Sequence, residues 1–138
     1  MASSFTGMTS ELKKRFRILI VDDNSDMAAS FAYLLEIMGH EARFIVDPQH
    51  AITKVDEFRP DIAFVHIGMV GLDGFGLARW LRNHYARHEL RLVAMSVYGD
   101  PATRDASMAS GFDAYLVKPA SAEAVETILG LVFDDRLR

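Results

Sequence analysis

Five short apolar segments, each followed by a stretch with helical periodicity, constrain the fold of this chain more than any other feature. The segments span residues 17–21, 41–46, 61–65, 90–95 and 113–117. Short continuous apolar runs are typical of strands that are covered on both faces. The segment 41–46 is partly polar, which favours a position nearer an edge of the sheet.

The stretches between these segments carry helix signals. Apolar residues at helical spacing predict inner helix faces, the first of which comprises Met27, Phe31, Leu34, Leu35 and Met38. The predicted helices span residues 27–38, 48–58, 77–85, 101–110 and from about 121 to 132. Strands alternating with helices across short loops predict one α/β domain, with a five-stranded parallel sheet and helices on both faces.

Length and composition bound the class of protein. The 138 residues suit one domain. We expect a flexible arm at residues 1–15, the domain at 16–134 and a short tail at 135–138.

The net charge of -4, without a dense Lys and Arg cluster, gives no reason to expect nucleic acid. The sequence has no cysteine, no apolar run of membrane length and no signal-peptide centre, so we expect a cytoplasmic protein without a membrane partner.

Polar residues follow four of the five predicted strands. The first strand leads to Asp22 and Asp23, the third to His66, the fourth to Ser96 and the fifth to Lys118. Each signal is weak alone, because an acidic pair often caps a helix and a lysine often lies in a solvated turn. Parallel sheets of this kind carry their active groups just beyond the carboxyl ends of the strands. The four strand ends therefore predict one shared site.

The motifs around these residues resemble the receiver domain of two-component response regulators. The similarity is carried by ILIVDDNSD, PDIAFVHIGMVGLDGFGLARWLR, LVAMSVYGD and GFDAYLVKPAS, and it extends from about Arg17 to Leu131. The segments GHEARFIVDPQHA and SGFDAYLVKPA are similar to those of receivers attached to hybrid histidine kinases. The resemblance implies a flavodoxin-like fold with strand order 2-1-3-4-5. It also implies a role in bacterial two-component or phosphorelay signal transduction, with a phosphoryl-accepting Asp at the end of the third strand.

The resemblance further implies a role for each residue at the strand ends. Asp22 and Asp23 would hold magnesium, together with the backbone carbonyl of Gly68. Ser96 and Lys118 would contact the phosphoryl group.

Three more features fit the same resemblance. The bond between Lys118 and Pro119 is expected to be cis. Tyr115 matches an aromatic residue that moves with activation. Asp73 and Gly74 fit the loop that follows the acceptor.

The chain departs from this family at the acceptor itself, within FVHIGMVGLDG. His66 occupies the acceptor position and Val70 a position where the family has proline. Imidazole in place of carboxylate removes a negative charge and an oxygen ligand, and magnesium prefers oxygen ligands. Two nearby carboxylates favour a protonated His66, whereas Lys118 and burial oppose it. The sequence leaves the sign of this pKa shift open.

Four interpretations of His66 follow. The favoured one is a pseudo-receiver, which is not an enzyme, has no catalytic residues or cofactor, and binds magnesium weakly or not at all. It would act through protein partners such as a histidine kinase or phosphotransfer protein, over the surface of roughly residues 101–133. The alternatives are phosphorylation of His66 itself, a transition-metal site that includes His66, and an engineered variant of an ordinary receiver.

Overall fold

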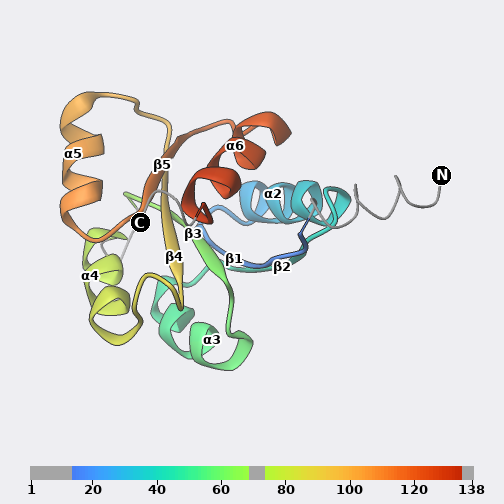
Figure 1. Ribbon diagram of the computed structural model, residues 1–138, viewed down its shortest axis with the longest axis horizontal. Helices are drawn as coiled ribbons and strands as arrows, with labels where there is room; N and C mark the ends of the chain where they lie inside the picture. Colours follow the sequence, from blue (N-terminus) through green and yellow to red (C-terminus); the bar gives the residue numbers. More distant parts are fainter. Residues whose placement is uncertain (1–13, 69–73, 135–138) are drawn as a thin grey trace.

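One parallel sheet is the centre of the computed structural model, which describes residues 14–68 and 74–134 (Figure 1). Its strands are β1 (Arg17–Val21), β2 (Glu41–Ile45), β3 (Ile62–His66), β4 (Arg91–Ser96) and β5 (Ala114–Val117). They lie in the order β2-β1-β3-β4-β5, and every neighbouring pair is parallel. The predicted fold and strand order are confirmed.

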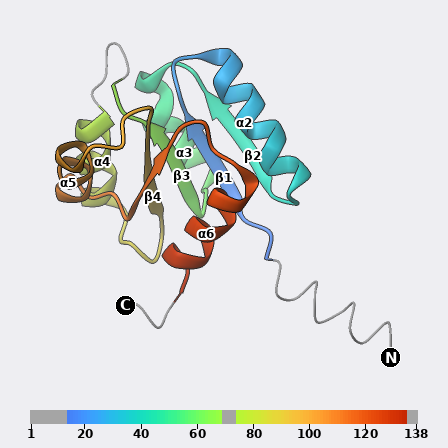
Figure 2. The same cartoon turned by 90° about the horizontal axis from the view of Figure 1, so that it is seen from above.

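Helices cover both faces of this sheet (Figure 2). They are α2 (Ser25–Ile37), α3 (Ala51–Phe58), α4 (Gly74–His84), α5 (Pro101–Ala109) and α6 (Ala122–Val132). Figure 2 shows α2 and α6 on one face and α3 and α4 on the other, with α5 beside α4. None of the helices within the described ranges is both long and apolar enough to cross a bilayer.

The alternation of side chains along the strands builds two cores. On β1, Ile18 and Ile20 belong to the cluster that contains the buried residues of α2 and α6. Leu19 and Val21 belong to the cluster that contains those of α3 and α4. Successive strand residues point to opposite faces, so continuous apolar runs are needed where both faces are covered.

Polar caps start the helices just beyond the strand ends. The Asn24 side chain accepts a hydrogen bond from the Met27 backbone N at 3.1 Å and so begins α2. The Ser121 hydroxyl accepts one from the Ala124 backbone N at 3.1 Å and begins α6. These caps fix the loops that carry the predicted site residues.

Two local predictions were wrong. Met27, predicted to face inward, is 39% exposed, because α2 instead buries Ala28, Ala32 and Leu35 against the sheet. The helix predicted from Pro48 begins as a separate 3₁₀ turn, η1 (Pro48–His50), on which the Asp47 side chain accepts from the Gln49 backbone N at 3.0 Å. Most of the predicted arm (residues 1–15) and all of the tail (135–138) lie outside the described residues.

His40 makes the stability of this fold dependent on pH. Its Nδ1 accepts a hydrogen bond from the Phe16 backbone N at 3.1 Å, and the residue is only 7% exposed. Burial lowers the pKa of His40 below its ordinary value of 6.5, Glu126 opposes this shift and Arg15 adds to it. The unfolded chain therefore binds more protons than the folded one as the pH falls below 6.5.

We expect the free energy of unfolding to be retained above pH 6.5 and to decline below it, by at most about 1.4 kcal/mol per pH unit for this residue. Urea unfolding of the wild type and of His40→Gln, between about pH 8 and pH 5, measures the effect. The comparison isolates His40 because His66 is present in both proteins. Equal pH dependence in the two proteins would show that His40 does not contribute.

Candidate functional site

Parallel strand ends bring the predicted site residues to one edge of the sheet. Asp22 directly follows β1, His66 ends β3, Ser96 ends β4 and Lys118 directly follows β5. The backbone joins two of these ends, because the Lys118 N donates to the Ser96 carbonyl at 2.8 Å. The Lys118–Pro119 bond is cis, as the resemblance implied.

The ammonium group of Lys118 lies between a carboxylate and an imidazole. Its Nζ donates to Asp22 Oδ2 at 2.7 Å and to His66 Nδ1 at 3.3 Å. The other Asp22 oxygen, Oδ1, accepts from the Asn24 backbone N at 3.0 Å. The side chains of Lys118 and Asp22 are 9% and 2% exposed, so little water screens this ion pair.

The surroundings of His66 favour its neutral imidazole form. Burial is the largest cause that lowers its pKa, Lys118 adds to the shift, and Asp22 and Asp23 oppose it. An ammonium group can only donate, so Nδ1 is the acceptor and the ring proton sits on Nε2. Two carboxylates and one ammonium then leave one net negative charge among these four side chains.

Three side chains at this edge could ligate a cation together. Asp22, Asp23 and His66 each offer a ligand atom, and these atoms all lie within 4.8 Å of one another. Magnesium prefers an octahedral shell of oxygen atoms, so a set that includes imidazole nitrogen suits it poorly. A mixed nitrogen and oxygen set suits d-block cations better. Gly68, the expected backbone ligand, lies in the left-handed region with φ of 91°.

Ser96 and Tyr115 meet at the backbone of Tyr98. The Ser96 hydroxyl accepts from the Tyr98 N at 3.1 Å, and the Tyr115 hydroxyl donates to the Tyr98 carbonyl. Both side chains are buried, and the Arg104 guanidinium lies 4.9 Å from the centre of the Tyr115 ring. Sequence reasoning missed Tyr98 because its backbone, rather than its side chain, makes these contacts.

Gly74 brings α4 against the end of β3. A Cβ atom at this position would lie 3.1 Å from the Cα of Ile67 and 3.2 Å from the carbonyl oxygen of His66. A side chain there would push α4 away from the site, which gives this glycine a packing role. Val70 and Asp73, the other positions singled out in this loop, lie outside the described residues.

Comparison with known proteins agrees with this geometry. The family described as the response regulator receiver domain matches residues 18–129. The transcriptional regulatory protein PrrA of Mycobacterium tuberculosis is 34% identical over 128 residues, which are 92% of this chain and 52% of that protein. The chain spans only 14% to 16% of three longer curated relatives.

Solved structures of response regulators share this fold. A two-component response regulator from Clostridium difficile aligns with a TM-score of 0.79 at 23% identity, over 90% of this chain and all of that one. A response regulator from Burkholderia pseudomallei, described with a phosphorylated aspartic acid and a calcium ion, aligns with a TM-score of 0.74 at 25% identity. That alignment covers 88% of this chain and 68% of the other. The chain therefore belongs to the family of response regulator receiver domains.

Proposed function

We propose that this chain is a pseudo-receiver, which acts in a bacterial two-component or phosphorelay pathway by binding protein partners without aspartyl phosphorylation. The observation that carries the proposal is the place of His66. It ends β3, where the resemblance to receivers expects the phosphoryl-accepting Asp, and it contacts Lys118, to which the same resemblance assigns a contact with the phosphoryl group. The surroundings of a receiver site are present, but the nucleophilic carboxylate is replaced.

The arrangement of His66 also counts against phosphorylation of the imidazole. A neutral imidazole carries its free lone pair on one nitrogen, and here that nitrogen is Nδ1. Nδ1 accepts the hydrogen bond from Lys118, so it would have to leave this contact before it could attack a phosphorus atom. The Asp22 carboxylate is similarly engaged, because both its oxygens accept hydrogen bonds.

Protein contacts are the proposed output. The surface formed by α5, β5 and α6 carries the exposed side chains of Met108 and Val117, with Tyr98 in the loop before α5. Exposed large apolar side chains on this surface favour a protein interaction site. A histidine kinase or a phosphotransfer protein is the class of partner that we propose, in the cytoplasm.

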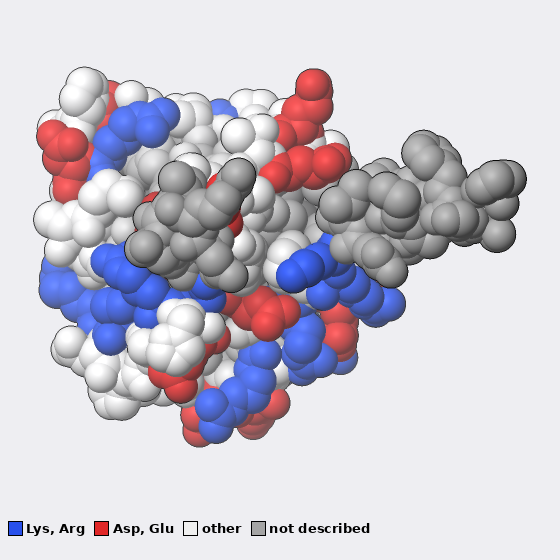
Figure 3. Space-filling view, viewed as in Figure 1, with Lys and Arg blue, Asp and Glu red and all other residues white. Residues whose placement is uncertain are grey.

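We propose no nucleic-acid partner for this chain and no enzymatic activity. The face drawn in Figure 3 carries Lys and Arg side chains interspersed with Asp and Glu. The net charge of the whole chain is -4. Neither feature favours a phosphate backbone, which requires excess positive charge.

Labelling with a small phosphodonor tests this function. We expect that the wild type, incubated with acetyl phosphate and magnesium, gains no phosphoryl group, whereas an aspartyl receiver treated in parallel does. Intact-mass measurement gives the adduct, and fragmentation locates it. An acid-labile adduct on His66 would support histidine phosphorylation instead, and an adduct on Asp22 or Asp23 would also contradict the pseudo-receiver.

A further inference from the structure

The Lys118 ammonium group already holds a cationic position between two potential metal ligands. It lies 2.7 Å from Asp22 Oδ2 and 3.3 Å from His66 Nδ1. Asp23 supplies a third ligand atom to the same cluster. A cation bound to these three side chains would compete with Lys118 for both of its side-chain contacts.

We propose that Asp22, Asp23 and His66 bind a d-block divalent cation, such as zinc or cobalt(II), which displaces the Lys118 ammonium group and replaces phosphorylation as the input to this site. The part of the proposal that concerns signal input rests on the proposed function. The binding itself is an independent property of these three side chains.

Charge and ligand type together select the class of cation. With the Lys118 ammonium group displaced, the charges of two carboxylates neutralise those of one divalent cation. With Lys118 in place and no cation bound, the cluster keeps one net negative charge. Magnesium carries the same charge as zinc but gains little from the imidazole, because it prefers oxygen ligands. Zinc and cobalt(II) accept imidazole together with carboxylate.

The imidazole already presents a nitrogen atom to a cationic group. Its Nδ1 lone pair is directed at Lys118 in the hydrogen bond described above. Once Lys118 moves away, the same lone pair is available to a metal ion.

Displacement of Lys118 provides a route from the site to the proposed partner surface. Lys118 directly follows β5, and its backbone N donates to the Ser96 carbonyl at the end of β4. The preceding residue, Val117, is exposed on the surface formed by α5, β5 and α6. A change in the position of Lys118 therefore acts on a strand end that adjoins this surface.

The test is a metal titration of the untagged full chain without any phosphodonor. We expect zinc and cobalt(II) to bind one ion per chain by calorimetry, and magnesium to bind at least about tenfold more weakly. Visible absorption of the cobalt(II) complex reports nitrogen ligation. Binding of magnesium as tight as that of zinc would overturn the proposal.

Three variants locate the ion. His66→Ala should weaken zinc binding at least about tenfold and alter the cobalt(II) spectrum, whereas His50→Ala, on the exposed η1 turn, should change neither. Lys118→Met, which removes the competing ammonium group, should strengthen zinc binding at least about tenfold even if His66→Ala folds poorly.

Two results would overturn the site. One is zinc affinity that survives His66→Ala, which would indicate adventitious binding to other histidines. The other is zinc affinity that Lys118→Met leaves unchanged. Since the titration contains no phosphodonor, its failure leaves the labelling test of the pseudo-receiver untouched.

Discussion

We expect acetyl phosphate to label His66→Asp but not the wild type. The substitution restores a carboxylate nucleophile at the end of β3, beside Lys118 and near Asp22. Three carboxylates against one ammonium also restore two net negative charges, which a magnesium ion offsets with oxygen ligands only. Intact-mass measurement of the variant with magnesium should give at least about tenfold more adduct than the wild type gives.

His66→Asn is the matched control for this prediction. Asparagine resembles Asp in size and also removes the imidazole, but its amide is neither a nucleophile nor a negative charge. We expect no adduct on this variant. Equal labelling of His66→Asp and His66→Asn would place the phosphoryl group elsewhere, and an unlabelled His66→Asp would show that other features of the loop, such as Val70 in place of proline, also disable the site.

Much of the fold was predictable because it depends on local patterns. The run RILIV predicts a strand covered on both faces whatever its neighbours, and the structure places its side chains alternately in the two cores. Met27 shows where this reasoning fails. Helical spacing gives two adjacent stripes on the same helix, and only packing against the sheet decides that Ala28 and Ala32 are inside.

The site was predictable as a set of residues but not as a charge state. Parallel strands must bring Asp22, His66 and Lys118 to one edge, so their proximity follows from the order of the elements. The pKa of His66 depends instead on burial and Lys118 acting against two carboxylates, and the balance is set by distances that the sequence does not contain. The backbone contacts of Tyr98 have no sequence signal either.

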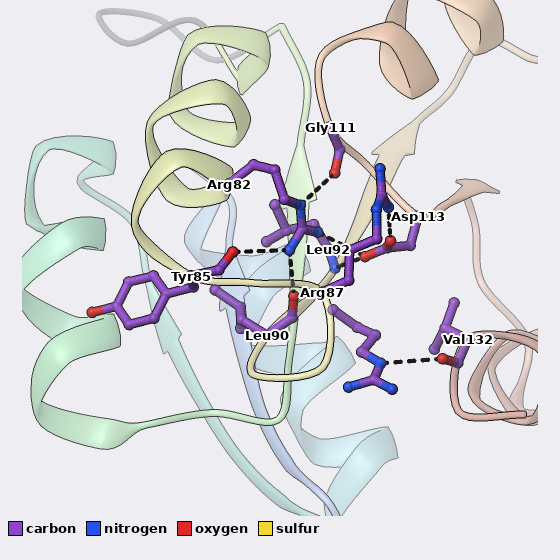
Figure 4. Close-up of polar contacts among 9 residues, drawn as sticks. Arg82, Tyr85, Arg87, Leu90, Leu92, Gly111, Asp113 and Val132 are labelled. Carbon is purple, nitrogen blue, oxygen red and sulfur yellow. Dashed lines mark hydrogen bonds and ion pairs between the residues drawn. The ribbon is translucent and has the colours of Figure 1, made fainter. Parts of the chain in front are cut away.

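A second polar cluster lies where β4 and β5 begin, away from the carboxyl ends of the strands that carry the site (Figure 4). It contributes to stability rather than to the site. Arg82 on α4 donates to the carbonyls of Gly111, Tyr85 and Leu90 at 3.1, 3.3 and 2.8 Å. Its Nη2 also donates to Asp113 Oδ2 at 2.8 Å. One side chain thus joins the end of α4 to the loops that precede β4 and β5.

Asp113 holds this cluster to the sheet. Its Oδ2 accepts from the Leu92 backbone N at 2.8 Å, and its Oδ1 accepts from Arg87. The side chains of Arg82 and Asp113 are 16% and 12% exposed, whereas that of Arg87 is 53% exposed. The two arginines therefore contact the same carboxylate from very different environments.

Arg82→Met should lower the free energy of unfolding by about 3 kcal/mol, because three backbone carbonyls lose their guanidinium donor and the largely buried Asp113 carboxylate loses one of its donors. For a domain of this size the loss corresponds to a fall in melting temperature of about 10 °C. Arg87→Met is the matched control and should cost less than about 1 kcal/mol, since exposed ion pairs contribute little. Urea and thermal unfolding of both variants, followed by circular dichroism, measure the difference.

The comparison separates burial from charge as the source of stability. Both variants remove one guanidinium group from Asp113, but the Arg87 ion pair is more exposed and contributes less than the Arg82 pair. The larger part of the expected difference arises because Arg82 also donates to three backbone carbonyls, two of which, at Leu90 and Gly111, lie in the loops before β4 and β5. Equal losses in the two variants would mean that these backbone contacts add nothing, and that α5 and the end of α4 are held by their apolar packing.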